Sequence, residues 1–204
     1  MTFAKLAAGL AVSTALIGSA TAAEIGIPSG TYVNDPTHTG LFWTVSHLGL
    51  SDYTARFNAV SATVELDADD ISQSSLIATI DMASVDTDYP NPEQVDFNAE
   101  LREQRWLNTD SFPEATFTST SITITGDETA EITGDLTFLG QTVPVTLDTQ
   151  LIGAAESHPF ANIPVFGIRA EGTFDRTDFG FSTLAPNVGT EVTIEINAEF
   201  LAQQ

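Results

Sequence analysis

The sequence predicts an all-β protein, an antiparallel sandwich or closed barrel of about eight strands with one short helical segment. β-Branched and aromatic residues alternate with polar residues in many short runs at fairly regular spacing. Turn-forming residues separate these runs. The connections are short enough for hairpins and too short for the crossovers that parallel strands need. One domain is expected, because 204 residues with 42% hydrophobic content can bury a single sizeable core.

The predicted strands follow one another from the first alternating run to the last. They cover residues 43–47, 56–66, 76–82, 115–124, 130–138, 143–152, 165–174 and 191–200. Acidic and glycine-containing turns separate them, for example at 67–70, 125–128, 139–141 and 187–189. A helical segment is predicted over 92–107, where apolar residues stand among polar ones and Pro92 lies near the first turn.

The first residues have the features of a secretory signal peptide. Lys5 gives a basic start, residues 6–20 form a small-apolar run, and residues 20–23 supply a small-residue cleavage site. The run is short for a membrane-spanning helix. The sequence therefore predicts a cleaved signal peptide over 1–23 and a single domain over 24–204, soluble after export.

Composition excludes several classes of function. The absence of cysteine rules out disulfides, cysteine-ligated metals and a cysteine nucleophile. Asp and Glu total 28 against six Lys and Arg, and a net charge of −22 makes nucleic acid an unfavourable partner. The chain after residue 23 contains no lysine, and this acidity favours a solvated surface.

The alternation also predicts which side chains face inward. This face is apolar, and it includes small residues that either leave a cavity or accept large neighbours, namely Ala59, Ala78, Gly134, Ala170 and Gly172. An eight-stranded barrel holds a small ligand only when side chains do not fill it. An outer-membrane barrel has similar alternation, but the short strands and the helical segment favour a soluble protein.

Several motifs follow one another in a fixed order between residues 30 and 200. They are Asp35-Pro36-Thr37-His38 with residues 43–51 (WTVSHLGLS) and 56–57 (RF), 84–87 (SVDT), 107–119 with its FPEATFTS end, 132–140 (ITGDLTFLG) and 176–180 (RTDFG). Together they resemble the YceI-like, polyisoprenoid-binding family. The resemblance implies an extended lipocalin-like antiparallel barrel, often dimeric, in an exported periplasmic protein. Its apolar tunnel would hold an isoprenoid chain, such as a polyprenyl phosphate or quinone tail, or another amphiphile.

Parity and family position together predict the residues that line this tunnel: Trp43, Val45, His47, Phe57, Ile80, Leu136, Phe138, Ile168 and Ile194. His47 is expected nearest to the ligand's head group. Residues 97–101 read FNAEL where the family commonly has R-D-x-H-L, and the lost cations favour a neutral head such as a quinone or fatty amide. Arg176 is expected to form a surface ion pair with Asp175 or Asp178.

No catalytic or metal-binding pattern accompanies these motifs. The histidines His38, His47 and His158 have no metal-ligand spacing, and no nucleophile elbow occurs. The sequence therefore predicts a lipid carrier or sequestering protein, not an enzyme, with no metal or cofactor apart from the bound lipid. Contact with a membrane or a membrane protein is a further possible partnership. The alternative is a structural or interaction module of the cell envelope with a packed interior and no ligand.

Overall fold

The computed structural model describes residues 25–203 and consists mostly of β-strands. The predicted signal peptide over 1–23 lies outside the described residues. The strands are β1 (Gly30–His47), β2 (Ser51–Phe57), β3 (Val60–Leu66), β4 (Ser75–Asp81), β5 (Val85–Asp86), β6 (Glu114–Ile124), β7 (Thr129–Phe138), β8 (Gln141–Ala155), β9 (Val165–Asp175) and β10 (Val188–Ala202). The helices are α1 (Phe97–Arg102) and three 3₁₀ turns, η1 (Ile71–Gln73), η2 (Met82–Ser84) and η3 (Arg176–Phe179).

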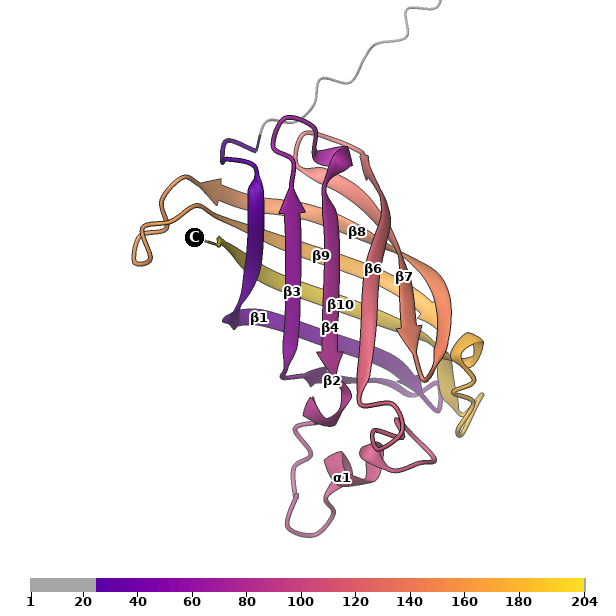
Figure 1. Ribbon diagram of the computed structural model, residues 1–204. Helices are drawn as coiled ribbons and strands as arrows, with labels where there is room; N and C mark the ends of the chain where they lie inside the picture. Colours follow the sequence, from indigo (N-terminus) through magenta and orange to yellow (C-terminus); the bar gives the residue numbers. More distant parts are fainter. Residues whose placement is uncertain (1–24, 204) are drawn as a thin grey trace, which may run out of the picture.

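Eight strands close into an antiparallel barrel, which confirms the predicted fold class. The order β10-β9-β8-β7-β6-β4-β3-β1 is completed by pairing of β10 with β1. In Figure 1, β3, β4 and β6 stand in front of β8, β9 and β10, and α1 lies beyond one end of the barrel. The two short strands β2 and β5 continue the sheet beside β1 at that end.

Strand β1 is the element that joins the two edges of the sheet. Its first part pairs with β3 from Gly30 to Val33, and its second part pairs with β2 from Leu41 to His47. Both parts pair with β10, on either side of a register shift between Asn34 and Thr39. Asn34 stabilises this bend, since its amide donates to the Val60 carbonyl and its Oδ1 accepts from the Ala62 N–H. The structure therefore has a much longer first strand than the sequence predicts.

The prediction of one continuous strand over 56–66 is wrong. The structure divides it into β2 and β3, with Asn58 and Ala59 between them. Residues on either side of this break no longer share one alternation, so Val60 and Ala62 line the interior and Ala59 is exposed. The predicted inward orientation of Ala59 is corrected for the same reason. The helical segment over 92–107 is also shorter than predicted, since α1 has six residues.

Apolar side chains point into the barrel, and polar side chains cover its outside. The buried core includes Leu41, Leu76, Phe117, Leu147 and Phe200. Pairs of threonines on neighbouring strands hydrogen-bond on the exposed face, for example Thr133 with Thr146 at 2.9 Å. An outer-membrane barrel has the reverse distribution, with a polar lumen and an apolar exterior. No helix within residues 25–203 is long and apolar enough to cross a membrane.

Two of the small inward-facing residues accept large neighbours and do not leave open space. A Cβ on Gly134 would overlap the Phe117 ring and lie 2.6 Å from the Thr118 carbonyl oxygen. A Cβ on Gly172 would lie 2.8 Å from Leu147 Cδ2. Both glycines are therefore packing positions, where a neighbouring side chain covers the bare backbone. Among the five small residues, Ala78 and Ala170 do line the cavity described below.

We expect Gly134→Ala to destabilise the barrel by about 1–3 kcal/mol, because the added methyl group has no space beside Phe117 and Thr118. Urea unfolding followed by circular dichroism measures this loss. Gly153→Ala is the matched control, because Gly153 also lies in a strand and a Cβ there meets no atom within 4 Å. Equal stability of the two variants would contradict the packing role of Gly134.

Candidate functional site

The interior of the barrel contains one large apolar cavity of about 510 Å³. All nine residues predicted to line a tunnel lie in its wall: Trp43, Val45, His47, Phe57, Ile80, Leu136, Phe138, Ile168 and Ile194. They come from six strands, and each points inward because its position matches the alternation of its own strand. Their contact with a ligand stays a prediction. A continuous void is not what the packed-module alternative predicts.

The segment between β5 and β6 completes the wall and was missed by the sequence analysis. Tyr89, Phe97, Leu101, Trp106 and Leu107 from this segment line the cavity. The N-cap Asp96 accepts a hydrogen bond from the Ala99 N–H at 2.8 Å and starts α1, which turns its apolar side chains towards the barrel. The signal in the sequence was the apolar spacing of Phe97 and Leu101, which lie four residues apart on one helix face.

The cavity opens at the end of the barrel near α1. Among its lining residues within 25–203, only His47 and Tyr89 are exposed. Neighbouring aromatic rings run inward from Tyr89 through Phe97 and Tyr53 to Trp43, with successive centroids 5.7, 6.0 and 6.1 Å apart. His47 lies at this opening, and its contact with a ligand's head group stays a prediction. We call this opening the mouth.

Arg176 lies inside the protein, and its predicted surface ion pair is wrong. The side chain is only 2% exposed, and the guanidinium donates to the carbonyl oxygens of Gly189, Phe181 and Val188 at 2.7–2.9 Å. It also lies over the Phe181 ring, 4.9 Å from the centroid. Burial lowers the pKa of Arg176, and the nearby Asp175 charge opposes this change. The guanidinium therefore fastens η3 to the start of β10, and its donors are directed at backbone carbonyls.

Three polar groups on the cavity wall are buried without a hydrogen-bond partner. They are Trp43 Nε1, the Tyr53 hydroxyl and Trp106 Nε1. Burial raises the pKa of Tyr53. The nearby Thr87 hydroxyl donates its hydrogen to Asn98 Oδ1 at 2.6 Å and forms no hydrogen bond with Tyr53. These three donors are neutral at ordinary pH, and they lie behind a cavity surface that is entirely apolar.

One cluster of potential metal ligands occurs among the described residues. Asp35, His38 and Glu199 place one ligand atom each within 4.8 Å of one another. His38 Nδ1 lies 2.8 Å from Asp35 Oδ2 and 3.8 Å from Glu199 Oε2, and the Asp35 contact is the main reason that the pKa of His38 is raised. No cluster within residues 25–203 combines two histidines. His47 lies at the mouth and His158 in the loop before β9, apart from this cluster.

Two aspartates tie strands and turns together through their ionised forms. Hydrogen bonds from Asn58, the Asp88 N–H and Arg56 lower the pKa of Asp86 to about 2. Hydrogen bonds from the Thr37 side chain and from His38 lower the pKa of Asp35 to about 2.

We expect the free energy of unfolding to fall as the pH drops from about 4 to about 2. The folded state holds the pKa of Asp35 and Asp86 below the ordinary value of 3.8, so it binds fewer protons than the unfolded chain. Their contribution is complete above pH 4 and is lost as the carboxylates protonate. Urea unfolding at pH 5, 4, 3 and 2 measures the slope. The double variant Asp35→Asn/Asp86→Asn should have a flatter profile, and an unchanged profile would contradict the assignment.

A YceI-like domain family model matches residues 32–200 of this chain. The chain is 34% identical over 187 residues to Protein YceI of Shigella flexneri, and this alignment covers 92% of this chain and 91% of that protein. The Burkholderia cenocepacia BcnA crystal structure superposes with a TM-score of 0.70 at 22% identity, covering 81% of this chain and 98% of BcnA. A polyisoprenoid-binding domain from Saccharophagus degradans, implicated in plant cell wall breakdown, superposes with a TM-score of 0.58 at 15% identity, covering 86% and 100%.

Proposed function

Since the chain belongs to the YceI-like family, we propose that it binds a long-chain isoprenoid or similar amphiphile inside its barrel and carries or sequesters it. The apolar cavity of about 510 Å³, open at His47 and Tyr89, is the observation that carries the proposal. The polyisoprenoid-binding domain with the same fold supports this class of ligand. We further propose that the protein works in the periplasm, as a binding protein without catalytic activity.

Removal of the apolar chain from water provides the driving force. Each buried methylene contributes about 0.8 kcal/mol, so part of an isoprenoid tail is enough for tight binding without many polar contacts. The wall suits such a tail, because its strand residues are aliphatic and aromatic side chains of varied size apart from Thr39, His47 and Thr149. Specificity would then depend on the length of the cavity and on the polar groups at its mouth.

We propose a ligand with a neutral head group that accepts hydrogen bonds, of the quinone or fatty amide type, in preference to a polyprenyl phosphate. The only guanidinium in the described wall belongs to Arg176, which already donates to three backbone carbonyls. The indole N–H groups of Trp43 and Trp106 and the Tyr53 hydroxyl have no partner. These donors lie behind the apolar surface of the cavity, so a carbonyl oxygen would reach them only after their side chains turn. A phosphate would enter a wall without free positive charge, whereas a neutral head group loses less on leaving water.

Native mass spectrometry of the purified protein, followed by extraction and identification of bound molecules, tests this function. We expect one long-chain amphiphile per barrel. The protein freed of bound lipid is then incubated with a quinone, a fatty amide and a polyprenyl phosphate of matched length to test the head group. The quinone and the fatty amide should bind more tightly than the polyprenyl phosphate. An empty protein that takes up none of the three would rule out the carrier function and favour the packed structural or interaction module.

A further inference from the structure

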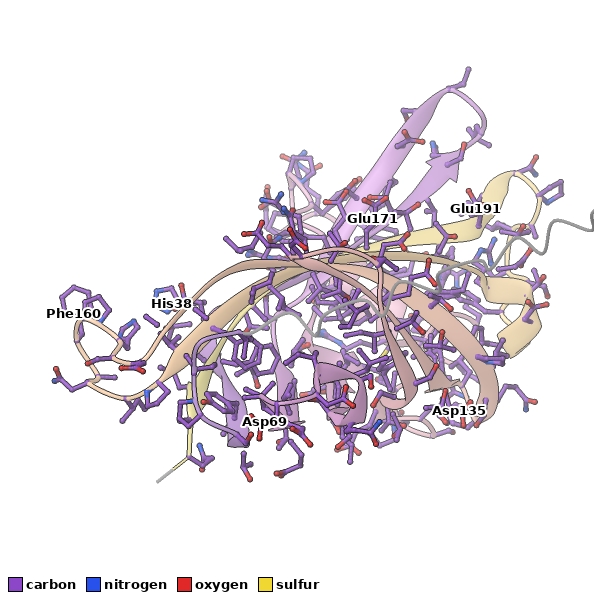
Figure 2. All side chains as sticks on the ribbon, turned by 90° about the horizontal axis from the view of Figure 1, so that it is seen from above. His38, Asp69, Asp135, Phe160, Glu171 and Glu191 are labelled. Carbon is purple, nitrogen blue, oxygen red and sulfur yellow. The ribbon has the colours of Figure 1, made fainter. Side chains whose placement is uncertain are left out.

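Three exposed leucines lie together on two loops beside the mouth. Leu48 and Leu50 belong to the β1–β2 turn and are 53% and 84% exposed, and Leu184 belongs to the loop before β10 and is 57% exposed. The Leu48 N–H donates to the Asn187 carbonyl at 2.7 Å, which joins the two loops. We call these three leucines the apolar rim. In Figure 2, the pale violet β1–β2 hairpin projects at the upper right, near Glu191 at the start of β10.

The rim leucines occupy positions that local conformation does not favour for leucine. Leu48 and Gly49 have φ values of 57° and 65°, and the Leu50 N–H donates to the His47 carbonyl across a β-turn with Leu48 and Gly49 at its centre. Such turns favour Asn-Gly, because left-handed backbone is unfavourable for a large side chain. Leu184 also has a φ of 57°. Single exposed apolar residues need no explanation, but three clustered leucines, two of them in left-handed conformation, indicate an interaction surface.

The two loops that carry the rim contain no acidic residue, although Asp52 and Glu191 directly follow them. Residues 46–51 and 182–190 contain no Asp or Glu, although the chain has 28 acidic residues and a net charge of −22. The overall charge disfavours an anionic surface at long range. An apolar rim bordered by Asp52 and Glu191 therefore fits a lipid surface that has no net negative charge.

The rim adjoins the mouth of the cavity. His47 directly precedes Leu48, pairs with Val188 across β1 and β10, and both residues line the cavity. A long-chain amphiphile of the kind proposed above resides in membranes, because its tail is poorly soluble in water. A mouth held against a lipid surface would let the tail pass into the barrel without crossing water.

We propose that the apolar rim of Leu48, Leu50 and Leu184 inserts into the interface of a zwitterionic phospholipid bilayer and places the cavity mouth against the membrane. This step rests on the proposed function for its purpose, but the docking itself is measured without any ligand. The three leucines would lie at the depth of the head groups and the adjoining acyl chains, as apolar side chains of peripheral membrane proteins do.

The absence of cysteine from the chain allows a site-specific test. Leu50→Cys, labelled with an environment-sensitive NBD fluorophore, should show a blue shift and brighter emission with phosphatidylcholine vesicles. Phe160→Cys is the matched control, because Phe160 is 89% exposed and lies at the opposite end of the molecule from the β1–β2 hairpin (Figures 1 and 2). We expect no shift at this position. Vesicles with half phosphatidylglycerol should give a smaller shift at Leu50 than pure phosphatidylcholine.

The triple variant Leu48→Asn/Leu50→Ser/Leu184→Asn provides the second measurement. Asn suits the two left-handed positions, so the fold should be retained. We expect at least a tenfold slower uptake of a quinone from phosphatidylcholine vesicles, with unchanged equilibrium affinity when the same quinone is supplied from ethanol.

Several results would overturn the docking. The first is an NBD emission of labelled Leu50→Cys that vesicles do not change. The second is an equal emission shift for labelled Leu50→Cys and Phe160→Cys. The third is an equal rate of quinone uptake for the triple variant and the parent protein. A Leu50 shift that appears without vesicles as protein concentration rises would assign the rim to a second copy of the chain instead. If the parent protein does not bind a quinone supplied from ethanol, the proposed function is overturned. The NBD emission measured with ligand-free vesicles still tests the docking in that case.

Discussion

Replacement of Ala78 by phenylalanine is expected to lower the affinity for a long-chain ligand about 100-fold. Ala78 lies on β4 and lines the cavity, so a ring at this position would occupy space that the ligand's tail requires. Displacement of about four methylenes costs about 3 kcal/mol, which corresponds to a factor of about 100 in the dissociation constant. Titration of a fluorescent isoprenoid analogue against the lipid-free protein measures the change in the dissociation constant.

Ile77→Phe is the matched control for this variant. Ile77 is the preceding residue of the same strand, is 55% exposed, and is not part of the cavity wall. A phenylalanine there should leave the affinity unchanged. Ala170→Phe offers a second block from the opposite part of the sheet, on β9, although Ala170 is only 2% exposed and its enlargement also strains the core. Unchanged affinity in Ala78→Phe, with the fold retained, would show that the ligand does not occupy this part of the barrel.

Arg176→Met is expected to destabilise the protein by about 3 kcal/mol or more. The substitution removes the donors of three buried hydrogen bonds and leaves the carbonyl groups of Gly189, Phe181 and Val188 without their partner. An unsatisfied buried polar group costs about 1–3 kcal/mol. For a domain of this size, the melting temperature should fall by about 10 °C. Thermal unfolding followed by circular dichroism gives the result.

Arg169→Met serves as its control, since Arg169 lies on the exposed face of β9 and forms no ion pair within 25–203. Its melting temperature should change by no more than a few degrees. A similar loss in both variants would indicate a general effect of removed positive charge from an acidic protein. A normal melting temperature for Arg176→Met would contradict the fastening of η3 to β10.

The sequence predicted the barrel and its inner face because alternation is a local property that the chain carries in each strand. Trp43 and Val45, or Ile168 and Ala170, lie two residues apart in continuous strands, and their side chains share a face as the alternation requires. The prediction failed where the chain bends. Asn58 and Ala59 separate β2 from β3, and no glycine or proline marks the break.

The remaining errors concern contacts between residues far apart in sequence. The sequence left open whether Gly134 makes open space or accepts a large neighbour, and the neighbouring strand supplies Phe117 to cover it. Arg176 read as a surface residue because Asp175 and Asp178 flank it, whereas the carbonyls that it binds belong to residues 181–189. Tyr89 and Trp106 have no alternation to place them, since they lie outside strands and their position depends on the loop around α1.

Closure of the barrel through β1 and β10 has a consequence for folding kinetics. Tyr32 pairs with Ala202 and Val45 with Val192, so the first strand completes its hydrogen bonds only with the last one. Contacts between such distant residues slow folding, because the ends of a long loop must meet before the pairing is formed. During synthesis, β1 therefore keeps one unpaired edge until the final residues emerge. That interval is when the newly made chain is most exposed to edge-to-edge aggregation.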